Sequence, residues 1–180
     1  MAHFARIEND LVVDVIVVSD DVLIDKSGVE SEALGQAFCS SLLGGEWKQT
    51  SYNGNIRSVF AGKGFEYNRE HDCFVVPSPF KSWAFNASTL CYEPPVPKPN
   101  VETGKDFFSW NEERLEWEYN PSLIRAYRGK LLSETDYAAL QDVVMSPEMA
   151  AYRQALRDIP QQAGFPNDII WPTKPTEATA

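Results

Sequence analysis

Proline is missing from the first 76 residues of this chain, although its 180 residues contain 12 prolines in all. Histidine occurs only twice, and cysteine occurs only at Cys39, Cys73 and Cys91. Three cysteines cannot all pair within one chain, so we expect reduced thiols and synthesis in a cytoplasm. Apolar runs such as Val15 to Val18 are far shorter than the roughly 20 residues that a transmembrane helix needs.

The net charge of −10 is unevenly distributed along the chain. Residues 1–120 hold 19 acidic and 10 basic residues, whereas residues 121–180 hold 7 and 6. An acidic chain repels nucleic acid phosphates and anionic lipids. We therefore expect neither nucleic acid nor a membrane as a partner.

Residues for catalysis or metal binding are few and poorly grouped. His71 and Cys73, with Cys91 and Cys39, could be combined into a zinc site, but paired Cys-x2-Cys spacing is absent. The acids around Glu112 leave a carboxylate pair for glycan cleavage open, although nothing singles out a pair. We expect no catalytic residues, no metal and no cofactor.

The N-terminal region alternates in the manner of β-strands. Phe4 to Glu8 and Leu11 to Val18 predict a hairpin that turns at Asn9 and Asp10. Trp47 to Tyr52 predicts a further strand, and Asn53-Gly54 predicts a tight turn into a return strand from Ile56 to Phe60.

One helix is predicted before residue 120. It begins near Ser31, ends at Gly44-Gly45, and places Leu34, Phe38 and Leu42 on one face.

A pattern of an aromatic residue, asparagine, five residues and a second aromatic residue occurs three times, with proline behind each copy. The copies run from Tyr67 to Phe74, from Phe85 to Tyr92 and from Trp110 to Trp117. Asparagine starts a turn by bonding its own backbone two residues on, and the two rings can meet as a cross-strand pair. The pattern predicts three short hairpins. Such units cannot bury their faces alone, so they must lie on each other, on the N-terminal sheet or on a partner.

From Ser122 onward the apolar spacing becomes helical. Ser122 is a candidate N-cap for a first helix, a short turn follows near Thr135, and Ser146-Pro147 predicts the start of another helix. Pro160 is expected to stop that helix.

These patterns predict an α+β fold. Residues 1–119 are expected to form a β-rich, antiparallel, sandwich-like domain with one helix and a stiff proline-rich segment at 94–99. Residues 122–172 are expected to form a small helical module, and 173–180 a flexible tail.

Two stretches of the helical module, Arg128 to Tyr137 and Tyr152 to Gln162, are followed by Phe165-Pro166 and Ile170-Trp171-Pro172. In order and spacing they resemble the conserved stretches of bacteriophage tail fibre assembly chaperones. One departure is Tyr137, where tryptophan is usual, and this change keeps the ring.

The resemblance implies a non-enzymatic chaperone that binds the distal part of a phage tail fibre and helps it fold and trimerise. It implies three chaperone copies per fibre trimer and a location in the host cytoplasm during phage assembly. A structural virion component, such as a baseplate or fibre-attachment protein, is the alternative, and a glycan-binding or glycan-cleaving tip protein is a more remote one.

Candidate contacts with the partner come from the hairpins and from the helical module. Arg153 and Arg157 lie on the polar side of their predicted helix, which favours contacts or rim ion pairs. Tyr152, Leu156 and Ile159 have the spacing of core residues, as do Phe165 and Trp171. The full set of candidates is Phe74, Trp83, Tyr92, Trp110, Trp117, Tyr127, Arg128, Tyr137, Arg153, Arg157, Phe165 and Trp171.

Overall fold

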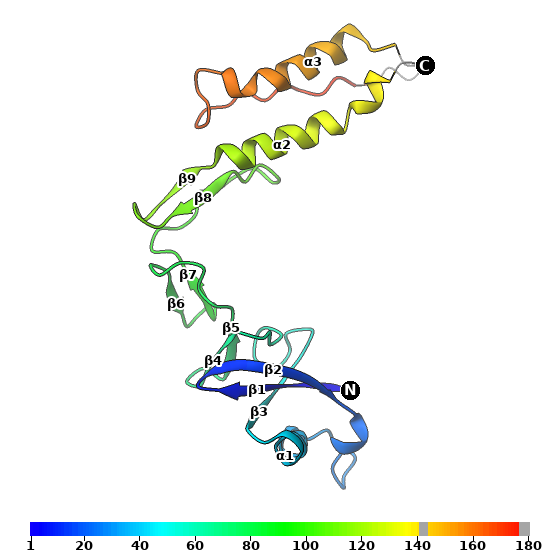
Figure 1. The fold of residues 1–180 in the computed structure, drawn as a ribbon, viewed down its shortest axis with the longest axis vertical. Helices are drawn as coiled ribbons and strands as arrows, with labels where there is room; N and C mark the ends of the chain where they lie inside the picture. The colour runs from blue at the N-terminus through cyan, green and yellow to red at the C-terminus, as the bar shows by residue number, and fades with distance from the viewer. Residues whose placement is uncertain (141–143, 177–180) are drawn as a thin grey trace. The chain divides into compact units, whose positions relative to one another are not determined.

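The computed structural model describes residues 1–140 and 144–176 (Figure 1). It combines an antiparallel β-rich region with C-terminal helices, so the predicted α+β class is confirmed. The elements are β1 (Ala2–Glu8), β2 (Leu11–Val18), η1 (Asp20–Val22), α1 (Glu32–Leu43), β3 (Glu46–Thr50), β4 (Glu66–Asn68), β5 (Cys73–Val75), β6 (Ala84–Asn86), β7 (Cys91–Glu93), β8 (Phe108–Asn111), β9 (Glu116–Tyr119), α2 (Pro121–Ser133), η2 (Asp136–Ala139), α3 (Pro147–Asp158) and η3 (Ile159–Gln161).

The chain forms two compact units, Met1–Pro95 and Val96–Ala180. The sequence places its boundary at residues 119–122, whereas the contacts place it before the third hairpin. The physical reason is Phe107, which is buried in the core of the C-terminal helices and accepts a backbone hydrogen bond of 2.7 Å from Asn120. Residues 177–180 of the predicted flexible tail lie outside the described residues.

The first unit is built on a five-stranded sheet with strand order β3-β1-β2-β4-β5. The predicted hairpin of β1 and β2 is confirmed, and its turn residues Asn9 and Asp10 have φ angles of 50° and 62°. Positive φ at both central residues is the geometry that matches the twist of two antiparallel strands.

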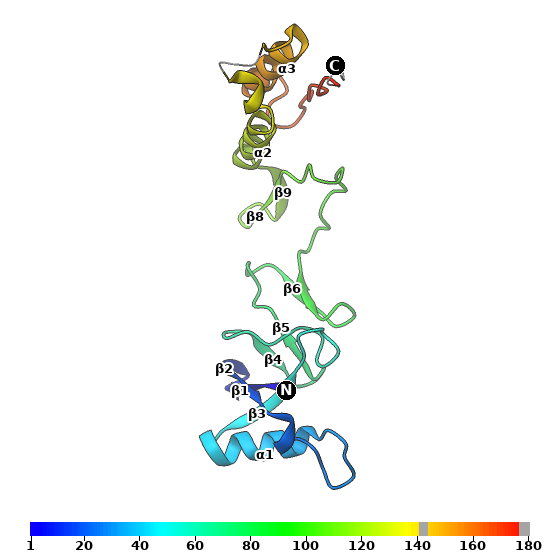
Figure 2. The same cartoon turned by 90° about the vertical axis from the view of Figure 1, so that its right-hand side faces the viewer.

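Each face of this sheet is covered by a different part of the chain. On one face Phe4 and Val18 pack with Cys39 of α1 and with Trp47. On the other face Ala5 and Val12 pack with residues that follow β3, among them Ala61. Figure 2 shows α1 alongside the sheet strands of this unit.

The predicted return strand from Ile56 to Phe60 is wrong. Residues 56–59 form turns and bends, and β3 pairs instead with β1. Arg57 and Ser58 have φ angles of 58° and 67°, which a β-strand does not allow. Arg57 gains from this conformation, because its guanidinium donates to the Gln49 carbonyl at 2.9 Å and pairs with Glu32 at 2.8 Å.

Helix α1 confirms the predicted helix but packs through its small residues. Gly35 and Cys39 are its buried residues, whereas Leu34, Phe38 and Leu42 are exposed. A Cβ atom at Gly35 would lie 2.1 Å from the ring of Phe4 and 2.8 Å from Leu23. The absence of a side chain at Gly35 therefore lets the helix approach the sheet closely.

Replacing Gly35 tests this close approach. Gly35→Ala should lower the free energy of unfolding by about 1–3 kcal/mol, because the new Cβ would overlap the ring of Phe4, which is fully buried. The matched control is Gly129→Ala in α2, where a Cβ meets nothing within 4 Å. That variant should be stabilised by up to about 1 kcal/mol through helix propensity alone. Urea unfolding followed by circular dichroism measures both, and equal effects at the two sites would contradict the packing argument.

Candidate functional site

The three aromatic hairpins predicted from the repeat are all present. The ring pairs lie directly opposite each other, with centroid separations of 5.5 Å for Tyr67 and Phe74, 6.0 Å for Phe85 and Tyr92, and 5.4 Å for Trp110 and Trp117. The repeat thus encodes one local structure three times.

Asparagine and a left-handed residue shape each hairpin turn. The side-chain oxygens of Asn68, Asn86 and Asn111 each accept a backbone N–H bond of 2.9–3.0 Å from a residue two or three positions later. Four residues after each asparagine the backbone has positive φ, at 44° for Asp72, 56° for Leu90 and 55° for Leu115.

The hairpins differ in what covers their rings. The first belongs to the five-stranded sheet, and Phe74 is fully buried in it. The second contacts the first, since the Tyr92 hydroxyl donates to Glu66 at 2.7 Å and the ring of Phe85 lies 5.3 Å from His71. The third lies in the second unit, where Trp110 is buried. Phe74 and Trp110, which the sequence analysis names as candidate partner contacts, are therefore core residues in this structure.

The proline-rich segment lies against the third hairpin. The indole nitrogen of Trp117 donates to the Val96 carbonyl at 3.0 Å, and the Lys98 ammonium lies 5.0 Å from the centre of the Trp117 ring. A carbonyl acceptor and a cation therefore hold this half-buried ring in place.

A buried arginine network fixes the first hairpin to the rest of its unit. The Arg57 guanidinium donates to Asp72 at 2.6 Å, and the Tyr67 hydroxyl donates to the same Asp72 oxygen at 2.5 Å. Burial and the bond to Asp72 raise the pKa of Tyr67 to about 12. Burial opposes ionisation of Asp72, but the bonds from Tyr67 and Arg57 outweigh it and lower the pKa of that carboxyl.

The raised pKa of Tyr67 makes the contribution of this residue to the free energy of unfolding depend on pH in the alkaline range. Its contribution is fully present below the unfolded pKa of about 10, and it is lost as pH rises through the folded value of about 12. The stability difference between the wild type and Tyr67→Phe should therefore shrink as pH rises from neutral to about 11. Unfolding free energies at several pH values measure it. Tyr52→Phe, at an exposed ring, is the control and should follow the wild-type profile. A constant difference for Tyr67→Phe would contradict the assigned role.

Two well-formed caps position the helices of the C-terminal module, defined here as residues 121–176. Asn120, rather than the predicted Ser122, caps α2, and its side chain accepts from Ser122 N–H. Ser146 caps α3 as predicted and accepts from Met149 N–H, with Pro147 in the first turn. Pro160 lies in η3, directly after α3 ends at Asp158.

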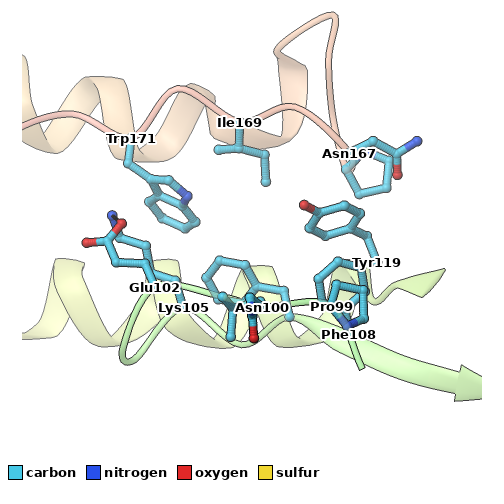
Figure 3. Close-up of a pocket in the computed structure, with 12 residues that line it drawn as sticks. Pro99, Asn100, Glu102, Lys105, Phe108, Tyr119, Asn167, Ile169 and Trp171 are labelled. Carbon is cyan, nitrogen blue, oxygen red and sulfur yellow. Dashed lines mark hydrogen bonds and ion pairs between the residues drawn. The ribbon is translucent and has the colours of Figure 1, made fainter. Parts of the chain in front are cut away.

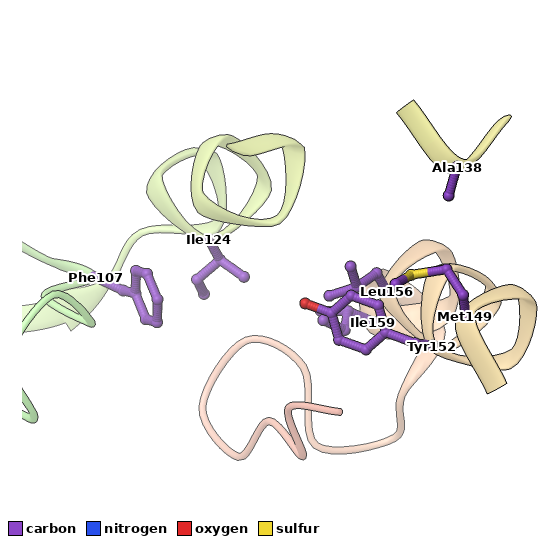
Figure 4. Close-up of a cluster of buried hydrophobic side chains, with 7 residues drawn as sticks. All are labelled: Phe107, Ile124, Ala138, Met149, Tyr152, Leu156 and Ile159. Carbon is purple, nitrogen blue, oxygen red and sulfur yellow. The ribbon is translucent and has the colours of Figure 1, made fainter. Parts of the chain in front are cut away.

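The core of the module is formed by residues of α2, α3 and the segments around them (Figure 4). Ile124 of α2 and Leu156 and Ile159 of the α3 region are fully buried, and Tyr152 is nearly so. Phe165 and Trp171 pack against this cluster while partly exposed. The interpretation of these residues as the module's own core is thus supported.

Arg153 joins the two motif stretches of the module. Its side chain is buried and donates to the Leu132 carbonyl at 2.9 Å, to the Thr135 hydroxyl at 2.6 Å and to Asp136 at 2.9 Å. The expectation of a position on the polar side is wrong for Arg153, because the end of α2 and the turn after it supply these three acceptors. Arg157, one turn later, is exposed.

A cluster of three aromatic rings forms part of the module's core and its edge. The rings of Phe107, Tyr127 and Trp171 lie 5.0–5.6 Å from one another. Beside them is a pocket of about 300 Å³ between the C-terminal segment and the loop of residues 99–105 (Figure 3). The charged groups in its lining are Glu102 and Lys105, and the Lys105 ammonium lies 2.9 Å from the Glu102 carboxylate. The two charges in the lining of this pocket are therefore paired with each other.

One packed unit thus contains the two motif stretches, the capped helices and the segment from Phe165 to Trp171. The sequence of this unit matches that of a known family. Residues 121–176 match the family model of the phage tail assembly chaperone protein. The resemblance inferred from the sequence is confirmed for this C-terminal module, which is called the chaperone module from here on. No curated protein and no solved structure matches the chain.

The candidate partner contacts outside the core remain predictions. Around the chaperone module, Tyr137 and Arg157 are exposed, and Tyr127, Arg128, Phe165 and Trp171 are half-buried. Trp83, Tyr92 and Trp117, in the segments before the module, are also half-buried. The candidate contacts do not include the exposed apolar face of α1, formed by Leu34, Phe38 and Leu42. The small residues Gly35 and Cys39, beside that face on the helix, were the signal that could have revealed it.

Groups that could hold a metal do not gather in the described residues. Among residues 1–140 and 144–176, no three His, Cys, Asp or Glu side chains lie in an arrangement suited to an ion. His3 packs near Phe60 at 5.1 Å, and His71 contacts Asn68 at 3.1 Å. In the same residues, no helix has the length and apolar content required to cross a bilayer.

Truncating Arg153 tests its role in the chaperone module. Arg153→Ala should lower the free energy of unfolding by about 2–4 kcal/mol, because it removes three hydrogen bonds of a buried guanidinium, one of them to the charged Asp136. The control is Arg157→Ala on the same helix, which should stay within about 0.5 kcal/mol of the wild type. Thermal unfolding followed by circular dichroism compares the two, and a similar small effect for both would contradict the joining role of Arg153.

Proposed function

We propose that this protein binds the distal part of a phage tail fibre and assists its folding and trimerisation, without a covalent step or a cofactor. The observation that carries the proposal is the family match over residues 121–176, which supports a chaperone role in phage tail assembly. The packing of both motif stretches into one module, joined by Arg153, agrees with that match.

The physical problem of fibre assembly fits such a helper. Chains of a trimer that intertwine expose unpaired strand edges and apolar surface until their partners arrive. A bound chaperone that covers these surfaces prevents aggregation in the interval. We propose that it acts in the host cytoplasm during assembly, with three copies on each fibre trimer.

A structural virion component, retained at the baseplate or fibre attachment, is the second candidate. The compact, capped chaperone module suits a permanent interface as well as a transient one. Mass spectrometry of purified virions separates the two, since stoichiometric amounts in the virion favour the structural role.

Co-expression with the fibre protein of the same phage tests the chaperone role. We expect soluble, trimeric fibre with the wild-type protein and insoluble or non-trimeric fibre without it. Leu156→Asp, which places a charge in the core of the module, should behave like omission of the protein. Val17→Ser, at an exposed position of the first unit, is the matched control and should retain full trimer yield. Normal trimerisation of the fibre alone would refute the proposal.

A further inference from the structure

Helix α1 presents its large apolar side chains to solvent. Leu34, Phe38 and Leu42 retain 40%, 38% and 64% of their exposure, and they recur every four residues along one side of the helix. Residues at this spacing are neighbours on a helix surface, so the three side chains form one continuous ridge about 12 Å long. Isolated exposed apolar residues are common, but a continuous row on one helix marks a contact surface.

The orientation of α1 is fixed by packing. Gly35 and Cys39 form its buried side, and any side chain at Gly35 would clash with Phe4. With 3.6 residues per turn, the ridge lies about 80° around the helix axis from Gly35 and Cys39, so a turn of that size would bring leucine and phenylalanine into the space that fits only Gly35. The ridge therefore cannot be buried within its own unit and stays available to another molecule.

The segment that contains α1 is mainly acidic. Helix α1 contains Glu32 and no lysine or arginine. Residues 20–46 hold six acids and one base, Lys26. Glu32 and Glu46 are paired with Arg57 and Arg69.

The remaining acids near α1 leave a negative excess. Asp21, Asp25 and Glu30 make no ion pair within the part of the chain that the structure describes. The whole first unit, with 13 acidic and 7 basic residues, has a net charge of −6.

We propose that the Leu34–Phe38–Leu42 ridge is the docking surface for an amphipathic helix of another polypeptide, with basic residues beside its apolar face. The ridge of one helix packs into the groove of another, and a basic partner is attracted by the net negative charge of the first unit. A second copy of this chain is the wrong occupant, because two units of charge −6 repel each other. This inference goes beyond the family match, which covers residues 121–176 and so lies wholly outside the first unit. It holds whether or not the fibre is the partner.

Two designed peptides of about 18 residues test the proposal with the full-length protein. Both carry leucine at the same helical positions; one has lysine and the other glutamate at the flanking positions. Fluorescence anisotropy measures binding at low and moderate salt. We expect the lysine peptide to bind, to weaken with salt, and to lose about tenfold or more in affinity with Phe38→Ser/Leu42→Ser. The glutamate peptide should not bind.

Val17→Ser is the control for the ridge variant, because it also removes an exposed apolar side chain, on the sheet of the same unit. It should leave affinity for the lysine peptide unchanged. Circular dichroism should show both variants folded, since all three side chains are exposed. The proposal is overturned if the lysine peptide fails to bind, if the ridge variant binds it as tightly as the wild type, or if both peptides bind equally. Sedimentation that shows a dimer broken by Phe38→Ser would overturn it as well, by identifying a second copy as the occupant.

Discussion

A two-stranded hairpin whose strands are only three or four residues long cannot bury its own aromatic pair. Much of this structure follows from that constraint. Each of the three hairpins solves it differently. The first adds Tyr67 and Phe74 to the N-terminal sheet, the second rests on the first through Tyr92, and the third joins the helices through neighbouring Phe107. The boundary between the two units falls between the second and third hairpins, because the second hairpin packs on the first and the third packs with the C-terminal helices.

Local sequence signals predicted the local geometry well. The asparagine-centred repeat gave the correct cross-strand partners in all three hairpins, and Ser146-Pro147 gave the start of α3. These features depend on interactions within a few residues, such as the side chain of Asn86 accepting a hydrogen bond from Ser88. A single sequence contains all the participants in such interactions, so its pattern is sufficient.

Features that depend on distant residues were not predictable in the same way. Asn53-Gly54 is a strong turn signal, yet β3 pairs with β1, and Arg57 is drawn out of a strand by Gln49, Glu32 and Asp72. Arg153 appeared polar-facing by helical spacing, but Thr135 and Asp136 lie where its guanidinium can reach them. In both cases a charged side chain with remote acceptors outweighed the local pattern, and those acceptors are known only once the chain is folded.

The conflict between pattern and packing is greatest at α1, and its consequence concerns function. Apolar spacing places Leu34, Phe38 and Leu42 on one face of the helix, but the helix packs through Gly35, which allows a closer approach to Phe4 than any larger residue would. Close packing of small residues against the sheet leaves the larger ones outside. The chaperone module, by contrast, uses its matched aromatic residues Tyr127 and Trp171 for its own cohesion. The exposed apolar area that we propose as a docking surface therefore lies on the first unit, whose net charge is −6.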